Sequence, residues 1–214
     1  MRSKFDEQLA LLNRDLTKMG SLCEEALALA AKALANADGE TAAKIAPIDN
    51  EIDQMERTIE SLCLKLLLQQ QPVARDLRQI SAALKMITDM ERIGDQASDI
   101  AEIIGFLNGR IGSDAQYICQ MAVAAMRMVT ESVEAYVKRD VAMAEATIQH
   151  DDVVDDLFLK VKNSLIQMIS ENPKDGEYAL DLLMIAKYFE RIGDHATNIA
   201  EWVVFSVTGV HEQG

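Results

Sequence analysis

Apolar residues recur along most of the chain at alternating spacings of three and four residues, which is the period of an amphipathic α-helix. The first such stripe extends over more than thirty residues, from Phe5 to Ala37. Its members change from leucine to alanine toward the C-terminal end, so we expect a neighbouring helix to approach more closely there. Asp38 and Gly39 follow, and the glycine predicts a helix end in the left-handed conformation.

Five further stripes of the same period predict five more helices. Prolines and glycines separate most of them, because a proline does not continue a helix and a glycine readily ends one. These stripes cover residues 48–66, 83–104, 118–135, 154–168 and 182–203.

The six predicted helices divide into two groups of three, with the break near residues 109–112. Three antiparallel helices with short connections form a bundle. Aromatic residues make up only 5% of the chain, which also favours helices over β-sandwiches. The sequence therefore predicts an all-α fold of two tandem three-helix bundles, the first over 1–109 and the second over 113–210.

A repeated segment indicates that the two halves are related by internal duplication. The sequence ERIGDQASDIAE at 91–102 returns as ERIGDHATNIAE at 190–201, with nine identities in twelve residues at an offset of 99. A weaker similarity at an offset of 102 relates DNEID at 49–53 to DDVVD at 151–155. Each of these four segments contains two carboxylate residues four positions apart.

The carboxylates of the first half are predicted to lie side by side on neighbouring helices. Asp53 and Glu91 both lie 19 residues from Pro72, one before it and the other after it. Asp49 and Asp95 both lie 23 residues from the same proline. Residues equally far from the connection of two antiparallel helices lie at the same height. Most of these carboxylates directly follow a stripe residue, which places them at the edge of the helix seam and not in its core.

The second half repeats this arrangement around Pro173. Its four carboxylates match in height to within one residue, and they are Asp151, Asp155, Glu190 and Asp194. Gly94 and Gly193 lie inside the repeated helices, where glycine costs about 1 kcal/mol relative to alanine. We expect both glycines to permit close helix contact beside the carboxylates.

Four negative charges on one seam repel each other, so the arrangement predicts a compensating cation. Oxygen-only ligation suits hard ions such as magnesium, manganese, calcium or iron. Zinc is also a candidate, although the scarcity of histidine and cysteine speaks against a structural zinc site. A solvated helix face with salt bridges is the alternative, because Arg57 follows Asp53 by four residues and Arg92 and Arg191 lie within the repeats. Leu159 stands in the place of Arg57 in the second half, whereas the carboxylates recur, which favours the metal.

Charge and composition argue against two classes of protein, those that bind nucleic acids and those that span a membrane. The net charge of −14 argues against direct nucleic-acid binding, since an acidic surface repels phosphate backbones. The three cysteines are isolated, and no apolar run reaches the roughly 18 residues that a membrane span needs. We therefore predict a cytoplasmic protein with no direct membrane span.

The twin ERIGD segments, each paired with an upstream DxxxD segment, resemble the PhoU family of bacterial phosphate-transport accessory proteins. The resemblance covers nearly the whole chain. It implies a protein that is not an enzyme, binds clusters of iron or other metals, and keeps the phosphate-starvation response off when phosphate is sufficient. The implied partners are the ATPase subunit of the phosphate transporter and a phosphate-sensing histidine kinase, and the implied assembly is a homodimer.

The resemblance also implies a set of metal ligands by position. These are Asp49, Asp53, Glu91, Asp95 and Asp99 in the first half and Asp151, Asp155, Glu190 and Asp194 in the second. Asn198 stands where the first half has Asp99, so we expect the second site to be poorer in charge. His195, beside Asp194, is more readily explained as an ordinary hydrogen-bonded histidine because Gln96 holds its place in the first half.

Two alternatives to the adaptor remain open. A di-iron carboxylate enzyme requires Glu-x-x-His motifs, and the residues three positions after Glu91 and Glu190 are Gly94 and Gly193. A helical scaffold without bound metal is the second alternative. Metal analysis separates the scaffold from the adaptor, and oxygen consumption with Fe²⁺ identifies the enzyme.

Overall fold

The regular structure in the described part of the chain is entirely helical. In the computed structural model this part comprises residues 2–69, 72–107, 109–111 and 115–210. The α-helices are α1 (Arg2–Asn36), α2 (Gly39–Ala42), α3 (Ile45–Gln69), α4 (Ala74–Phe106), α5 (Gln116–Lys138), α6 (Val141–Gln149), α7 (Asp151–Glu171) and α8 (Gly176–Thr208), and a 3₁₀ turn, η2 (Pro173–Asp175), precedes α8. The six long helices that the apolar stripes predict are confirmed, and none of the described helices combines the length and apolar character needed to cross a bilayer.

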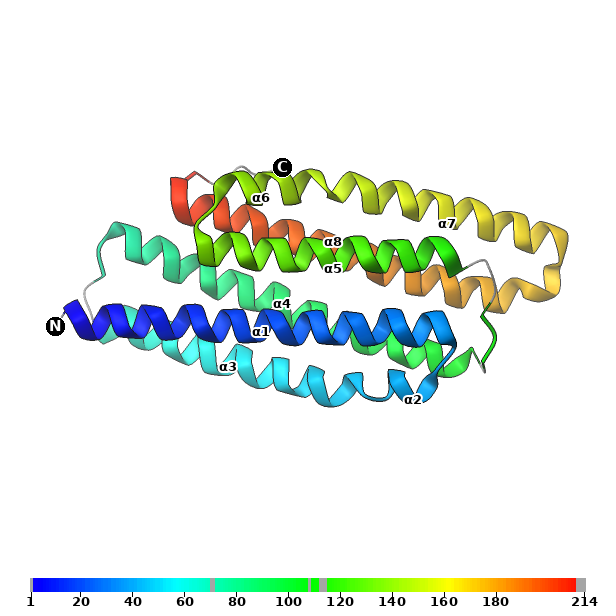
Figure 1. Ribbon diagram of the computed structural model, residues 1–214, viewed down its shortest axis with the longest axis horizontal. Coiled ribbons are helices and arrows are strands. Elements are labelled where there is room, and N and C mark those ends of the chain that lie inside the picture. The colour runs from blue at the N-terminus through cyan, green and yellow to red at the C-terminus, as the bar shows by residue number, and fades with distance from the viewer. Residues whose placement is uncertain (1, 70–71, 108, 112–114, 211–214) are drawn as a thin grey trace.

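Helices α1, α3 and α4 form one bundle, and α5, α7 and α8 form the other (Figure 1). The bundles lie side by side, with α4 against α8 and α1 against α5. One continuous hydrophobic core includes buried residues of both bundles. Helix α4 of the first bundle ends at Phe106 and α5 of the second begins at Gln116, and the predicted boundary at 113 lies outside the described residues.

The end of the first helix differs from the prediction. Ala37, not Gly39, takes the left-handed conformation, with φ of 52°. The side chain of Asp38 accepts hydrogen bonds from the backbone N–H groups of Glu40 (3.0 Å) and Thr41 (3.2 Å) and so starts α2. Gly39 is therefore the first residue of a helix. The prediction was wrong because the aspartate cap competes with the glycine for control of the turn.

The second half contains the same junction. Arg139 is left-handed, with φ of 57°, and Asp140 caps α6 by accepting a hydrogen bond from the backbone N–H of Met143 (3.0 Å). The apolar stripes missed α6, since nine residues are too few to show the helical period clearly.

A polar contact joins the two bundles along α4 and α8. The Asp89 carboxylate lies 2.9 Å from His195 Nδ1 and accepts a hydrogen bond from Asn198 Nδ2 (3.2 Å). At the offset of 99 between the halves, Tyr188 corresponds to Asp89, Gln96 to His195 and Asp99 to Asn198. Tyr188 and Asp99 also form a hydrogen bond, so the matching positions make a second contact between α4 and α8. The expectation that His195 is a hydrogen-bonded histidine is confirmed.

Replacing Asp89 with alanine is expected to lower the free energy of unfolding by about 1–2 kcal/mol, because the partly buried His195 loses its partner across the interface, whereas the exposed Asn198 can bond to water instead. Denaturant titration monitored by circular dichroism measures the change. Tyr188→Phe is the matched control in the other half, and its effect is expected to be smaller because Asp99 retains contact with water. Equal losses for the two variants would contradict this account.

Candidate metal centre

Carboxylates of α3 and α4 meet at the edge of the first bundle. Asp49, Asp53 and Asp95 each present an oxygen, and these three atoms lie within 4.8 Å of one another. The side chains of Asp53 and Asp95 are 35% and 40% exposed, so the edge opens to solvent. The predicted match in height between α3 and α4 is confirmed, and an ion has room to approach from outside.

Asp49 is the innermost member of this group. Its Oδ2 accepts a hydrogen bond from Ser98 Oγ (2.9 Å), whereas its Oδ1 is buried and has no hydrogen-bond partner. Burial raises the pKa of the Asp49 carboxyl, and the charges of Asp95 and Asp53 raise it further, although the Ser98 hydrogen bond opposes them. A buried acceptor without a donor is unfavourable. A cation held at Asp49 Oδ1 would remove this cost, so the residues fit a metal ion.

Two further carboxylates extend the cluster. Burial and the charge of Asp95 raise the pKa of Glu91, and burial followed by the charges of Glu60 and Asp53 raises that of Glu56. Glu56 was missed by sequence reasoning, which examined only carboxylates four residues apart. The available signal was its position directly after the stripe residue Met55.

Gly94 allows α4 to approach Asp49 closely. A Cβ atom at this position would lie 2.7 Å from Asp49 Oδ1 and 3.0 Å from Ile52 Cδ1, so any side chain here would force these neighbours to move. At Gly193 the corresponding Cβ would lie 3.2 Å from Asp151 Oδ1. The expected role of both glycines in close helix contact is confirmed.

Salt bridges compensate only part of the negative charge. Arg57 Nη2 lies 3.3 Å from Asp53, and Arg92 lies 3.4 Å from Glu91 and 3.1 Å from Asp95. Both arginines are more than half exposed, so these contacts are weak. Neither forms an ion pair with Asp49. The solvated salt-bridge interpretation therefore leaves the innermost carboxylate without an ion-pair partner among the described residues.

The second half gathers its carboxylates more loosely, between α7 and α8. The pKa of Asp151 is raised to about 6, first by burial and then by the charges of Asp194, Asp155 and Glu190. Lys187 forms an ion pair with Glu190 and lies over the ring of Phe158, which stands in the place of Glu56. Among the described residues, only the first half brings three possible ligand atoms within 4.8 Å of one another.

Asp99 and Asn198 lie toward the interface between the bundles. Asp99 shares a hydrogen bond with Tyr188, yet it is near enough to raise the pKa of Asp49. Asn198 donates a hydrogen bond to Asp89. This exchange of aspartate for asparagine therefore changes the interface as well as the charge near each cluster.

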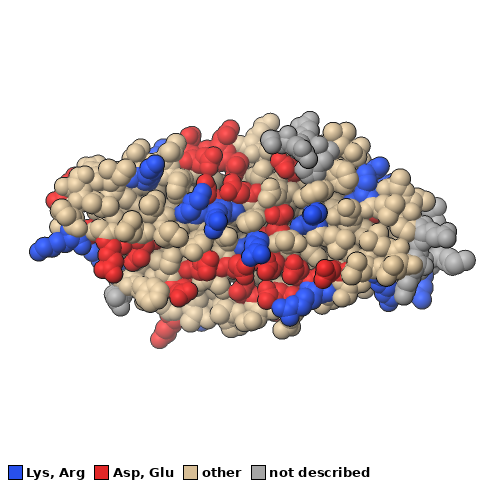
Figure 2. Space-filling view, turned by 180° about the vertical axis from the view of Figure 1, so that it is seen from behind, with Lys and Arg blue, Asp and Glu red and all other residues tan. Residues whose placement is uncertain are grey.

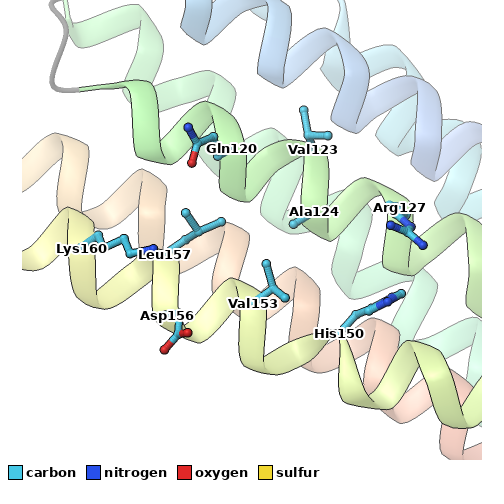
Figure 3. A pocket seen from close by; sticks show the side chains of 9 residues that line it. All are labelled: Gln120, Val123, Ala124, Arg127, His150, Val153, Asp156, Leu157 and Lys160. Atoms are coloured by element: carbon cyan, nitrogen blue, oxygen red, sulfur yellow. The ribbon is translucent and has the colours of Figure 1, made fainter.

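Acidic side chains gather across the middle of the face on which α4 and α8 lie (Figure 2). A groove of about 430 Å³ between α5 and α7 (Figure 3) has a different character. Apolar atoms form most of its wall, and its polar lining includes Arg127, Lys160, His150 and a single carboxylate, Asp156. One carboxylate beside an arginine and a lysine makes a poor cation site, so the carboxylate clusters remain the candidate metal centre.

Comparison with known proteins agrees with this geometry. The sequence pattern of the PhoU domain matches residues 16–104 and again 118–203. A PhoU homolog of Clostridium acetobutylicum, named a phosphate-specific transport system accessory protein, is 37% identical over 97% of this chain and 96% of its own length. The crystal structure of PhoU from Pseudomonas aeruginosa, 34% identical, covers 96% of this chain and all of that one with a TM-score of 0.92. The crystal structure of the phosphate transport system regulatory protein PhoU from Streptococcus pneumoniae is 26% identical in sequence. It covers 98% of this chain and 99% of its own chain, with a TM-score of 0.88. The duplicated bundles and the full-length likeness show that this chain belongs to the PhoU family.

Proposed function

We propose that this chain is a metal-binding regulatory adaptor of phosphate transport and not an enzyme. The relatives named above are accessory or regulatory proteins of phosphate transport, and they match this chain over nearly its whole length. The observation that carries metal binding is the set of three carboxylate oxygens within 4.8 Å of one another, one each from Asp49, Asp53 and Asp95, together with the buried and unpartnered Oδ1 of Asp49. In the first half the ion would be held by Asp49, Asp53, Glu91 and Asp95, and the nearby carboxylate of Glu56 would add negative charge. Asp151, Asp155, Glu190 and Asp194 would hold one in the second half.

The adaptor acts in the cytoplasm, as a homodimer, on two partners. These are the ATPase subunit of the phosphate transporter and a phosphate-sensing histidine kinase, and contact with them keeps the starvation response off while phosphate is plentiful. The carboxylates lie on an outward face, so ions bound there would change the charge that a partner meets. Pull-down of each partner by metal-loaded and chelated protein tests this function. Capture of neither partner in either state would contradict it.

Replacing Glu91 with glutamine and Asp95 with asparagine is expected to lower the metal content by about half, because the second cluster is left intact while the first loses two of its oxygen ligands. Helicity measured by circular dichroism should not change, since both side chains are partly exposed. Metal content is measured by elemental analysis after loading with Mn²⁺ and gel filtration.

The control for this experiment is E145Q/E171Q, which removes two exposed carboxylates outside both clusters. It is expected to keep the full metal content. Unchanged metal content in the E91Q/D95N variant would show that the first site is wrongly assigned. Absence of bound metal in the unaltered protein would instead favour the scaffold, and oxygen consumption with Fe²⁺ would favour the enzyme.

A further inference from the structure

Three arginines meet at the end of the molecule where α4 begins. Arg75 and Arg78 lie in the first two turns of α4, and Arg139 lies at the junction between α5 and α6. Figure 1 shows the start of α4, this junction and the end of α8 at the same end of the protein. Arg139 Nη1 donates a hydrogen bond to Gln79 Oε1 (3.4 Å), which places its guanidinium beside the first turns of α4.

The positive charges of this cluster act on one another. Burial lowers the pKa of Arg139, and the charges of Arg75 and Arg78 lower it further, while Tyr136 and Asp76 oppose them. Asp76 is a carboxylate on the first turn of α4, and it accepts a hydrogen bond from the backbone N–H of Val73 (3.4 Å). In a chain with a net charge of −14, three arginines that repel one another require an explanation.

Within the described residues, none of the three arginines forms an ion pair with a carboxylate. Four other arginines, Arg57, Arg92, Arg110 and Arg127, each do so. The Nε of Arg78 is buried and has no hydrogen-bond partner. Leaving such a donor unsatisfied is unfavourable, so among the described residues Arg78 lacks an acceptor for its Nε.

The duplicated half shows that the fold does not need these arginines. Ala37 occupies the place of Arg139, at an offset of 102, and takes the same left-handed conformation. At the offset of 99 that relates α4 to α8, Lys174 and Glu177 stand in the places of Arg75 and Arg78. The equivalent helix junction therefore forms without any of the three side chains.

One of the arginines also has a possible structural role. The Arg78 side chain lies against Gly209, which caps the C-terminal end of α8, where a positive charge is favourable. This role explains one arginine. It does not explain Arg139, which lies beside Gln79, or the exposed Arg75.

We propose that Arg75, Arg78 and Arg139 form a binding site for an oxyanion of the phosphate class. The guanidinium group presents paired donors that match phosphate oxygens, and the N-terminal end of α4 adds positive potential. Three guanidinium groups suit a multiply charged tetrahedral anion better than a planar carboxylate, which has one charge and two oxygens. The ligand is either free inorganic phosphate or the phosphoryl group of a larger molecule.

This site is separate from the metal centre. Arg78 and Asp95 are 17 residues apart on the same helix, which corresponds to about 25 Å. Binding by the arginines therefore requires no metal ion. A failure of one proposal leaves the other standing.

Isothermal titration calorimetry in chloride buffer with a chelator tests the proposal. The probes are inorganic phosphate, glycerol 3-phosphate as a phosphate monoester, and acetate. We expect saturable binding of phosphate or of the monoester at millimolar concentration or below, with acetate at least about tenfold weaker. Preference for the monoester identifies a larger phosphorylated ligand, and preference for phosphate identifies the free ion.

Three variants locate the binding. R75Q/R139Q and R78K are each expected to weaken it by about tenfold or more, R78K because lysine keeps the charge but loses the paired donors. R127Q/R191Q removes two arginines elsewhere and is expected to bind within about twofold of the unaltered protein. Thermal unfolding confirms that each variant is folded. No saturable binding by the unaltered protein, equal binding of acetate, or equal losses in R127Q/R191Q would overturn the proposal.

Discussion

Replacing Gly94 with alanine is expected to destabilise the protein and displace Asp49, although alanine ordinarily favours a helix by about 1 kcal/mol. The new Cβ would lie 2.7 Å from Asp49 Oδ1 and 3.0 Å from Ile52 Cδ1. Either α3 and α4 move apart or the carboxylate turns away. Overpacking of this kind costs about 1–3 kcal/mol, which offsets or exceeds the gain in helix propensity. Metal content should fall together with the free energy of unfolding.

Two other glycines provide controls for this variant. Gly105 lies in the same helix with nothing within 4 Å of its Cβ position, so Gly105→Ala should stabilise the protein by about 1 kcal/mol. At Gly193 the nearest atoms are Asp151 Oδ1 at 3.2 Å and Val154 Cγ1 at 3.5 Å, so alanine there should have an intermediate effect. Denaturant titration and elemental analysis of all three variants measure the series. If Gly94→Ala proves as stable as Gly105→Ala, the close contact does not constrain Asp49.

The sequence was sufficient to predict the long helices and the meeting of the carboxylates. Apolar periodicity reports which face of a helix is buried, and counting residues from Pro72 reports height along antiparallel helices. Both quantities depend on the regular geometry of the helix alone. For this reason Asp49 and Asp95 could be placed together, and the structure confirms it.

Features that depend on a neighbouring helix could not be predicted in this way. The counted spacings show neither that Asp89 of one bundle contacts His195 of the other nor that Asp49 Oδ1 has no donor. The difference between the halves has the same origin. Phe158 and Lys187 reduce the negative charge around Glu190, and these residues do not belong to the repeated motif.

Without metal ions, the protein is expected to become less stable as the pH rises from about 4 to about 7. The pKa of Asp151 is 3.8 ordinarily and about 6 in the folded protein, so the folded state binds its proton more tightly than the unfolded state does. Between these two values the folded state holds more protons, and the free energy of unfolding falls as the pH increases. The pKa values of Asp49, Glu91 and Asp194 are also raised, and they contribute with the same sign.

Thermal unfolding in a chelator at several pH values between 4 and 7.5 measures this trend, since 1 kcal/mol corresponds to about 2–4 °C in a chain of this size. Asp151→Asn should flatten the slope because it removes a carboxyl with a strongly raised pKa. Added Mn²⁺ should reverse the sign, because metal binding requires the deprotonated carboxylates and strengthens as the pH rises. A metal-free protein that gains stability across this range would show that the clustered carboxylates are already compensated by the chain itself.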